Sequence, residues 1–295
     1  MEISSQVELT RLQRVQRAIH FMENHLTEPI TIADAADAAC YSLYHFCRTF
    51  NSVAHHSPYD YLMRRRLSQA AERLVESRSK IIDIAFDYQF NSPESFSRAF
   101  KKMFSVQPKQ YRNRGSLDRR QLLTELTSER LDLMSRAVSL IPERTHLDGS
   151  TLSGLMGPIQ EDAGLVAGLW EDLNTDHPLE GETDVSSLSS HLGVAGFPQG
   201  WNRSGFYYSA AVPRQGTGES NPAMVTTQLP AGDYARFTFK AKLRELIAIL
   251  EYVFQTWLPN SDYSPDIPFV ILSYGRKPSG VDDGEIVQQV FVPLG

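Results

Sequence analysis

The first 116 residues carry a helical pattern of apolar positions. From Leu9 to Leu26, apolar side chains recur every three or four residues, which predicts an amphipathic helix over residues 8–26. The same spacing recurs from Leu62 to Leu74 and predicts a long helix over residues 58–76. Shorter apolar segments precede and follow it, and Pro108 is placed to begin a last short helix. The pattern predicts an all-helical region of about seven helices.

One stretch of this region occurs twice. FCRTFNSVAHHSPYDY at residues 46–61 and FSRAFKKMFSVQPKQY at residues 96–111 share two Phe, an Arg, a Pro and a Tyr, each pair separated by 50 positions. Five matches at one offset indicate a duplicated unit. We call residues 31–61 copy one and residues 81–111 copy two.

Each copy is predicted to be a helix-turn-helix. In copy one, Thr31 is placed to cap a helix that begins at Ile32, and Ser42 to cap a second helix with Phe46 and Phe50 on its inner face. In copy two, residues 81–88 form the first helix and residues 91–92 the turn and cap. Pro93 then stands at the favoured first position of a helix whose buried stripe is Phe96, Phe100 and Phe104.

The outer faces of the second helices are candidates for contact with double-stranded DNA. With the Phe side chains inside, the outward residues are Ser42, Tyr44, His45, Cys47, Arg48 and Thr49 in copy one, and Glu94, Ser95, Ser97, Arg98, Lys101 and Lys102 in copy two. Arg is suited to bidentate contact with guanine in the major groove, which predicts base contacts for Arg48 and Arg98. Lys101, Lys102, Arg112 and Arg114 are suited to phosphate contacts. The run Arg64-Arg65-Arg66 has two interpretations, a solvated helix start with surface salt bridges or a partial DNA contact, because three successive residues span much of a helix circumference.

After residue 136 the pattern changes to a mixture of strands and helices. Strand-like runs occur at 194–197, 206–212, 224–229, 234–239, 269–274 and 286–292, and helical runs at 160–173 and 241–257. This mixture predicts an α+β domain. The polar stretch before it, with scattered Leu, is typical of a linker. The predicted organisation is a DNA-binding domain at 1–116, a linker at 117–136 and a second domain at 137–295.

Charge separates the two halves. The whole chain of 295 residues has a net charge of −6, but residues 1–116 contain 16 Lys and Arg against 12 Asp and Glu, and the remainder 13 against 23. A net +4 beside a net −10 is consistent with a nucleic-acid-binding part joined to a partner domain.

The two cysteines fit neither a disulfide framework nor a common zinc pattern, and no apolar run of 18 residues and no signal peptide is present. We expect a cytosolic protein with no cofactor, no metal site and no membrane partner.

Specific residues of the first half resemble the DNA-binding domain of AraC/XylS-type bacterial transcription regulators. They are YSLYHFCRTF at 41–50, SPYDYLMRRRL at 57–67, IIDIAFDYQF at 81–90, SFSRAFKKMF at 95–104 and QPKQYR at 107–112. The resemblance implies two helix-turn-helix units held apart by the middle helix, with recognition helices in successive major-groove segments. It implies base-facing positions for Ser42, Tyr44, Cys47 and Arg48, and for Pro93, Glu94, Ser95, Ser97 and Arg98. The chain departs from the family at Cys40 and Gln89, where Gly is usual.

The second half is similar to the GyrI-like effector-binding domain, through residues 229–263 and the closing IVQQVFVPLG. This domain order is that of Rob-like regulators. The resemblance implies a ligand cleft lined by aromatic residues, for which the candidates are Tyr207, Tyr208, Phe237, Trp257 and Phe269. Cation-binding members carry a Glu on the strand that matches FVILSY at 269–274, and no acid stands there. Its absence favours a neutral or amphipathic effector, or a protein partner.

No nucleophile elbow, phosphate-binding loop, dinucleotide fingerprint or zinc-protease motif occurs, so we identify no catalytic residue. We predict a sequence-specific, nucleoid-associated transcription regulator, an activator that contacts RNA polymerase. The alternative is a ligand-sequestering or hydrolytic GyrI-like protein in which DNA binding is secondary.

Overall fold

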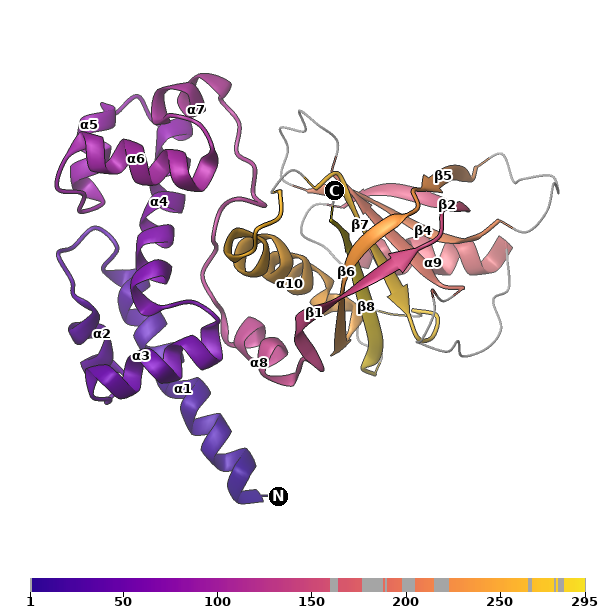
Figure 1. Cartoon of the computed structure of the whole chain (residues 1–295), viewed down its shortest axis with the longest axis horizontal. Helices are drawn as coiled ribbons and strands as arrows, with labels where there is room; N and C mark the ends of the chain where they lie inside the picture. The colour runs from indigo at the N-terminus through magenta and orange to yellow at the C-terminus, as the bar shows by residue number, and fades with distance from the viewer. Residues whose placement is uncertain are drawn as a thin grey trace. The chain divides into compact units, whose positions relative to one another are not determined.

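The computed structural model describes residues 2–159, 164–176, 188, 190–197, 205–214, 223–264, 267–278, 280 and 284–294 (Figure 1). The chain divides into two compact units. Residues 1–135 and Glu251–Asn260 form the helical unit, and residues 136–250 and 261–295 form the sheet unit. The short stretch from Glu251 to Asn260 is thus separated in sequence from the rest of its unit.

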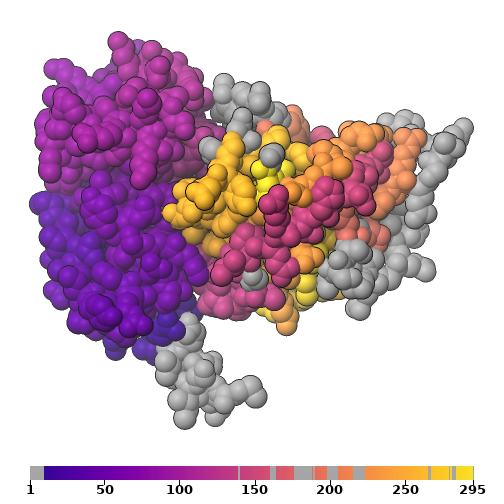
Figure 2. Space-filling model, in the orientation of Figure 1, coloured from indigo at the N-terminus to yellow at the C-terminus, as the bar shows by residue number. Residues whose placement is uncertain are grey.

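The helical unit confirms the predicted all-helical fold. Its helices are α1 (Glu2–Asn24), α2 (Ile32–Ala38), α3 (Leu43–Ala54), α4 (Pro58–Glu76), α5 (Ile81–Asp87), α6 (Pro93–Phe104), α7 (Pro108–Arg114) and α8 (Ser128–Arg136), the last residue of which belongs to the sheet unit. In the space-filling view, the indigo surface of copy one and the magenta surface of copy two are continuous with each other (Figure 2).

Local sequence signals explain where these helices begin and end. Thr31 and Ser92 cap α2 and α6 through reciprocal hydrogen bonds with the third residue of each helix. Ser42 occupies the corresponding position of α3, but its side chain makes no capping bond, contrary to our expectation. Helices α3 and α6, the second helices of copy one and copy two, correspond to the recognition helices of the family. After each of them the chain turns through a residue with a left-handed backbone, His55 in copy one and Ser105 in copy two.

The two departures from the family pattern also have a left-handed backbone. Cys40 and Gln89 have φ angles of 55° and 64°, which a side chain with a Cβ adopts only at an energetic cost. The backbone that Gly usually provides is therefore retained without Gly.

The predicted apolar stripes form the core of the helical unit. Phe46, Phe50, Phe96 and Phe100 are completely buried, and Phe104 is nearly so. In copy two the aromatic rings contact in sequence from Phe90 to Tyr111. Thr49, expected on the outer face of α3, is buried instead, because it lies beside Phe50 at the edge of the stripe.

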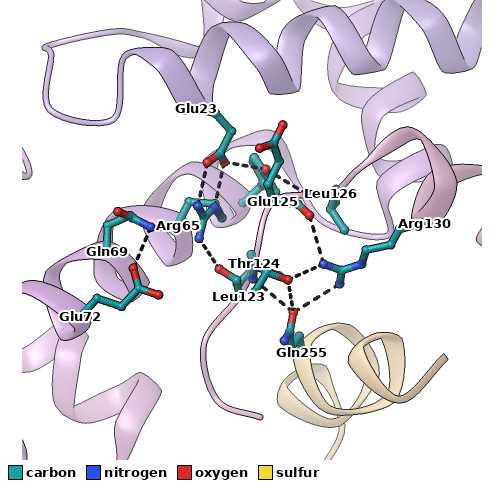
Figure 3. A network of polar contacts seen from close by, with 11 residues as sticks. Glu23, Arg65, Gln69, Glu72, Leu123, Thr124, Glu125, Leu126, Arg130 and Gln255 are labelled. Atoms are coloured by element: carbon teal, nitrogen blue, oxygen red, sulfur yellow. Dashed lines mark hydrogen bonds and ion pairs between the residues drawn. The ribbon is translucent and has the colours of Figure 1, made fainter. Parts of the chain in front are cut away.

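The Arg64-Arg65-Arg66 run is buried and not a solvated helix start. Arg65 makes two hydrogen bonds to the Glu23 carboxylate and one to the Leu123 carbonyl (Figure 3). Arg66 donates to the carbonyls of Leu26 and Glu28, beyond the carboxyl end of α1. Arg64 lies 4.0 Å from the Asp60 carboxylate. The run therefore fastens α4 to its neighbours, which a pattern of successive positive charges does not predict.

Residues 117–135, expected to be a linker, are folded onto the helical unit. Leu122, Leu123 and Leu126 are buried, as are Leu131, Leu133 and Met134 of α8. The scattered Leu residues of this polar stretch are the anchors. Leu122, Leu123 and Leu126 lie in non-helical backbone before α8, so a search for helical periodicity does not identify them as buried residues.

The sheet unit is the predicted α+β domain, built on one antiparallel sheet. Its strands are β1 (Ser139–Leu147), β2 (Ser150–Ile159), β3 (Leu192–Gly196), β4 (Phe206–Pro213), β5 (Val225–Leu229), β6 (Gly232–Ala241), β7 (Phe269–Tyr274) and β8 (Ile286–Pro293). They are ordered β1-β6-β8-β7-β3-β4-β2-β5. The sequence runs predicted all of them except β1 and β2.

Helix α9 (Gly164–Asp176) contacts β2 and β4. The second helical run is a succession of short elements, a 3₁₀ turn at Leu243–Glu245, α10 (Leu246–Glu251), a π-helix at Tyr252–Trp257 and a 3₁₀ turn at Leu258–Asn260. No helix in the described part of the chain is long and apolar enough to cross a membrane.

Candidate nucleic-acid interface and effector site

The outer face of α6 carries the predicted DNA-binding residues of copy two. A groove of about 680 Å³ is lined by Pro93, Glu94, Ser97, Arg98, Lys101, Lys102 and Gln107. Within the described residues, Arg98, Lys101 and Lys102 form no hydrogen bond or ion pair with other side chains. Three exposed cations that form no such bond are available to an anionic ligand such as the DNA backbone.

Ser95 differs from the other predicted residues of this face. Its hydroxyl donates to the Ser92 carbonyl at 2.7 Å and accepts from the Ser92 amide. The side chain thus closes the capping box of α6 and is only half-exposed. A base contact from Ser95 would have to compete with these bonds.

The outer face of α3 holds the predicted residues of copy one, which are less basic. Ser42, Tyr44, His45 and Arg48 are exposed, and Cys47 is half-exposed. The Arg48 guanidinium lies over the Tyr44 ring at 5.7 Å and within 3.4 Å of its hydroxyl. The two side chains are one helical turn apart, so they can interact along the exposed face of α3.

Arg112 has a structural partner set that its sequence position did not predict. Its guanidinium donates to the Leu74 carbonyl at 3.0 Å and to the Ser79 carbonyl at 2.7 Å. It thereby closes the carboxyl end of α4, as Arg66 does for α1. Arg114, in the same short helix, is exposed.

Strand alternation separates the aromatic residues predicted to bind an effector. Tyr208 pairs with Ala195 in β3, and Ala195 with Val270, whereas Tyr207 pairs with Gly196, and Gly196 with Phe269. Paired residues of an antiparallel sheet point to the same face, and successive residues to opposite faces. Tyr207 and Phe269 therefore share one face, which we call the Tyr207 face, and Tyr208 lies on the opposite one, the Tyr208 face.

The Tyr208 face is the one covered by α9. Trp170 of α9 donates to the Tyr208 hydroxyl at 3.0 Å, and this hydroxyl is 2.8 Å from that of Tyr274. Burial raises the pKa of both tyrosines above its usual value. Phe237, also on this face and in register with Val290, is completely buried. The sequence pattern identifies neither Trp170 nor Tyr274 as part of this network, because their polar atoms meet only in the folded sheet.

The Tyr207 face carries an apolar cluster with neutral polar groups. The cluster consists of Leu152, Leu192, Val194, Ala211, Leu229, Tyr234, Ile271 and Phe291, with Phe269 packed against it. The buried polar side chains in register with it are Ser209, Ser273 and Gln289. None of these three is charged, in agreement with the absence of an acid from β7.

Trp257, the fifth predicted ligand residue, belongs by its contacts to the helical unit, whereas the other four belong to the sheet unit. In the described residues, no group of three or more His, Cys, Asp or Glu side chains is arranged to hold a metal ion.

Comparison with known proteins gives a separate match for each half. Residues 35–114 match a family described as a helix-turn-helix domain, and residues 146–280 one described as integron-associated effector binding protein. Over 197 residues the chain is 30% identical to an uncharacterized HTH-type transcriptional regulator, YbfP, of Bacillus subtilis, covering 64% of this chain and 66% of that protein. Over 92 residues it is 41% identical to the transcriptional regulator Rob of Salmonella typhimurium, covering 31% and 32%.

The matched residues thus span 66% of the length of YbfP and 32% of the length of Rob. A solved structure of an integron cassette protein from Vibrio cholerae covers 53% of this chain and 97% of its own, with 9% identity and a TM-score of 0.38.

Proposed function

Because the chain belongs to the AraC family of helix-turn-helix transcription regulators and carries a C-terminal effector-binding domain, we propose that it binds double-stranded DNA sequence-specifically through α3 and α6. The observation that carries this proposal is the duplication. Both recognition helices present an exposed Arg at the same repeat position, Arg48 and Arg98, outside a completely buried Phe stripe. Two equivalent arginines suit the reading of two adjacent major-groove segments.

The roles of the other outward residues follow from their charge and their existing bonds. Lys101 and Lys102 are suited to phosphate contacts that fix orientation. The other outward polar side chains able to reach base edges are Ser42, Tyr44, His45, Cys47 and Ser97. Glu94 disfavours nearby phosphates and suits an exposed cytosine amino group. Ser95 and Arg112 support the interface through their backbone bonds.

Binding of the full chain to a random pool of DNA fragments tests this proposal. We expect selection of one sequence class, with affinity for it at least about 1,000-fold above that for scrambled DNA. The affinity should fall steeply with salt, because phosphate contacts release counterions. Salt-sensitive binding without sequence preference would contradict the proposal and favour a protein whose DNA binding is secondary.

The proposal extends to activation of transcription. A protein bound beside a promoter, in the bacterial cytoplasm at the nucleoid, is placed to contact RNA polymerase. The support is that the relatives named above carry the name of transcriptional regulators. Transcription in vitro from a promoter that carries the selected site should increase when the protein is added, and a decrease would identify a repressor.

For the sheet unit we propose that an effector contacts Tyr207 and Phe269 beside the apolar cluster. Tyr208 and Phe237 are completely buried on the opposite face and are better suited to supporting the sheet. Because the buried polar groups of the Tyr207 face are neutral, a cation should gain nothing over a neutral molecule of the same shape.

Thermal shifts with methyltriphenylphosphonium and with triphenylphosphine oxide test this expectation. The two probes have similar shape and differ in charge. We expect the cation to stabilise the protein no more than the oxide does, and less in the variant Phe269→Ala than in the wild type. Clearly greater stabilisation by the phosphonium would show that a carboxylate faces the ligand.

A further inference from the structure

Residues 251–260 lie inside the stretch that matches the effector-binding family, but their contacts place them in the helical unit. The chain enters this stretch from the sheet unit at Leu250 and returns to it at Ser261. We call Glu251–Asn260 the docking segment. Its contacts with residues 55–56 and 119–130 are all internal to the helical unit.

Gln255 is the centre of these contacts. Its side-chain oxygen accepts hydrogen bonds from the Thr124 amide at 3.2 Å, the Thr124 hydroxyl at 3.0 Å and the Arg130 guanidinium at 3.3 Å (Figure 3). Its amide nitrogen donates to the Arg119 carbonyl at 3.3 Å. Gln255 is almost completely buried, so its removal would leave several buried polar groups without partners.

Charged and aromatic groups fix the rest of the segment. The Glu251 carboxylate accepts from the Thr124 hydroxyl and lies 3.4 Å from the Arg130 guanidinium. The Thr256 hydroxyl is 3.1 Å from Nε2 of His56, which is buried just before α4. Arg120 lies over the Phe254 ring, and His55 contacts the Tyr252 ring.

The backbone of the segment is unusual as well. Tyr252–Trp257 form a π-helix, a conformation rare in proteins and frequent at functional sites. Five consecutive residues from Tyr252 to Thr256 are buried. An amphipathic surface helix would bury only one face.

The same contacts connect the segment to α4, the helix that separates the two recognition helices. Residues 123–124 connect the two (Figure 3). The Leu123 carbonyl accepts a hydrogen bond from Arg65 of α4. The Thr124 hydroxyl accepts a hydrogen bond from Arg130 and donates one to the side-chain oxygen of Gln255. Arg65 also pairs with Glu23 of α1, with both side chains largely buried. Buried networks of this kind restrict the positions of the elements that they join.

We propose that the docking segment is an intramolecular ligand of the helical unit, which holds α4 and both recognition helices in the arrangement that binds DNA. Because the segment is continuous in sequence with the effector-binding domain, its docking is the route by which an effector alters DNA affinity. The effect on DNA rests on the proposed function, whereas the docking itself does not. A recognition surface that is held rigid loses less entropy on binding, so release of the segment weakens DNA binding.

The substitution Gln255→Leu in the full chain tests the docking, because it keeps similar volume and removes four hydrogen bonds. Hydrogen exchange without DNA should become about tenfold faster or more in residues 119–130 and 251–260. Exchange in β7 and β8 should stay unchanged. Asp262→Asn, an exposed change just outside the segment, is the matched control and should leave exchange as in the wild type. Unchanged exchange at 119–130 in Gln255→Leu would overturn the docking.

Two further measurements connect docking to DNA. Affinity for the DNA fragment selected by the wild type should fall about fivefold or more in Gln255→Leu, and that DNA should slow exchange of 251–260 in the wild type by linkage. Wild-type affinity in a variant with faster exchange would overturn the coupling. If the wild type selects no DNA sequence, the proposed function fails, but exchange in the free protein still decides the docking. If Gln255→Leu does not fold, Thr256→Val removes only the partner of His56 and should shift exchange in the same direction by a smaller factor.

Discussion

Copy one and copy two have the same internal framework and different outer faces. At the offset of 50, Phe46 matches Phe96, Phe50 matches Phe100 and Tyr61 matches Tyr111, and all six side chains are buried. The left-handed turns at His55 and Ser105 keep the same offset. The buried positions that form the helix-turn-helix are therefore repeated, since both copies need side chains of the same size to fill the space between their helices.

The outward positions of the recognition helices are not repeated, with one exception. The residues of copy one and their equivalents 50 positions later in copy two are Tyr44 and Glu94, His45 and Ser95, Cys47 and Ser97, Asn51 and Lys101, and Ser52 and Lys102. Within the helices only Arg48 and Arg98 agree, while Ser42 and Ser92, which also match, precede α3 and α6 as their N-cap residues. The comparison suggests that the two arginines are a common anchor and that the other residues give each copy its own sequence preference.

The largest expected effect comes from the repeated framework. Phe50→Ala and Phe100→Ala each remove a completely buried ring and should each lower the free energy of unfolding by about 3–5 kcal/mol. Chemical denaturation measures this, with the exposed change Asn51→Ala as control. A small loss in one copy and a large loss in the other would show that the two frameworks are not equivalent.

The shared arginines should affect DNA binding and not folding. Arg48→Ala and Arg98→Ala should each weaken binding to the selected DNA by about 1–3 kcal/mol and relax the preference at one base position. Lys101→Ala is the matched comparison, because loss of a phosphate contact weakens binding to all sequences alike and reduces the salt dependence. Fluorescence anisotropy at several salt concentrations measures both. If Arg48→Ala lowered the affinity for every DNA sequence by the same factor, Arg48 would contact phosphate and not a base.

The pH dependence of stability should differ between the two copies. Copy one has His55 and His56 at the positions where copy two has Ser105 and Val106. Burial lowers the pKa of His56 below 6.5, and burial together with the charge of His56 lowers that of His55. In the unfolded chain both take up a proton at higher pH. Their contribution to stability is thus complete above pH 6.5 and is lost as the pH falls below that value.

The denaturation midpoint should therefore decrease between about pH 7.5 and 5.5. His56→Gln keeps groups able to bond Asp60 and Thr256 and should show a smaller decrease. An identical pH dependence in this variant would exclude His56 as its source.

The smallest effect concerns the left-handed residues before each turn. Cys40→Gly should raise the free energy of unfolding by up to about 1 kcal/mol, because Gly adopts this backbone without the Cβ clash. Gln89→Gly should gain less, since it also removes the hydrogen bond from the Gln89 amide to the Thr27 carbonyl at 2.6 Å. Thermal denaturation compares the two. A larger gain at 89 than at 40 would contradict this reasoning.

The sequence was most informative where local rules decide the structure. Pro58 and Pro108 mark the first positions of α4 and α7, and Thr31 and Ser92 cap their helices as expected. These features depend on a few neighbouring residues, so that periodicity and capping preferences predict them. The repeat then places Arg48 and Arg98 on outer faces without further information.

Long-range partners could not be predicted in this way. Arg65 is buried because Glu23, 42 positions away, supplies two acceptors, and no local pattern marks that pair. Two of the aromatic candidates for the effector site could have been separated from the sequence alone, because the alternation of side chains along the predicted strand 206–212 is a local rule. Tyr207 and Tyr208 are successive residues of one strand, so they cannot share a face, and Trp257 belongs by contact to the other unit. Similarly, the docking of 251–260 depends on Thr124 and Arg130, more than 120 positions earlier.

The measurement that tests the central claim most directly is selection of bound fragments from random DNA by the full chain, by Arg48→Ala and by Arg98→Ala. The wild type should select a site with two blocks of conserved bases about one helical turn apart. Each variant should lose sequence information in one block only, and a different one for each variant. A single block, or loss of the same bases in both variants, would contradict the reading of DNA by two equivalent recognition helices.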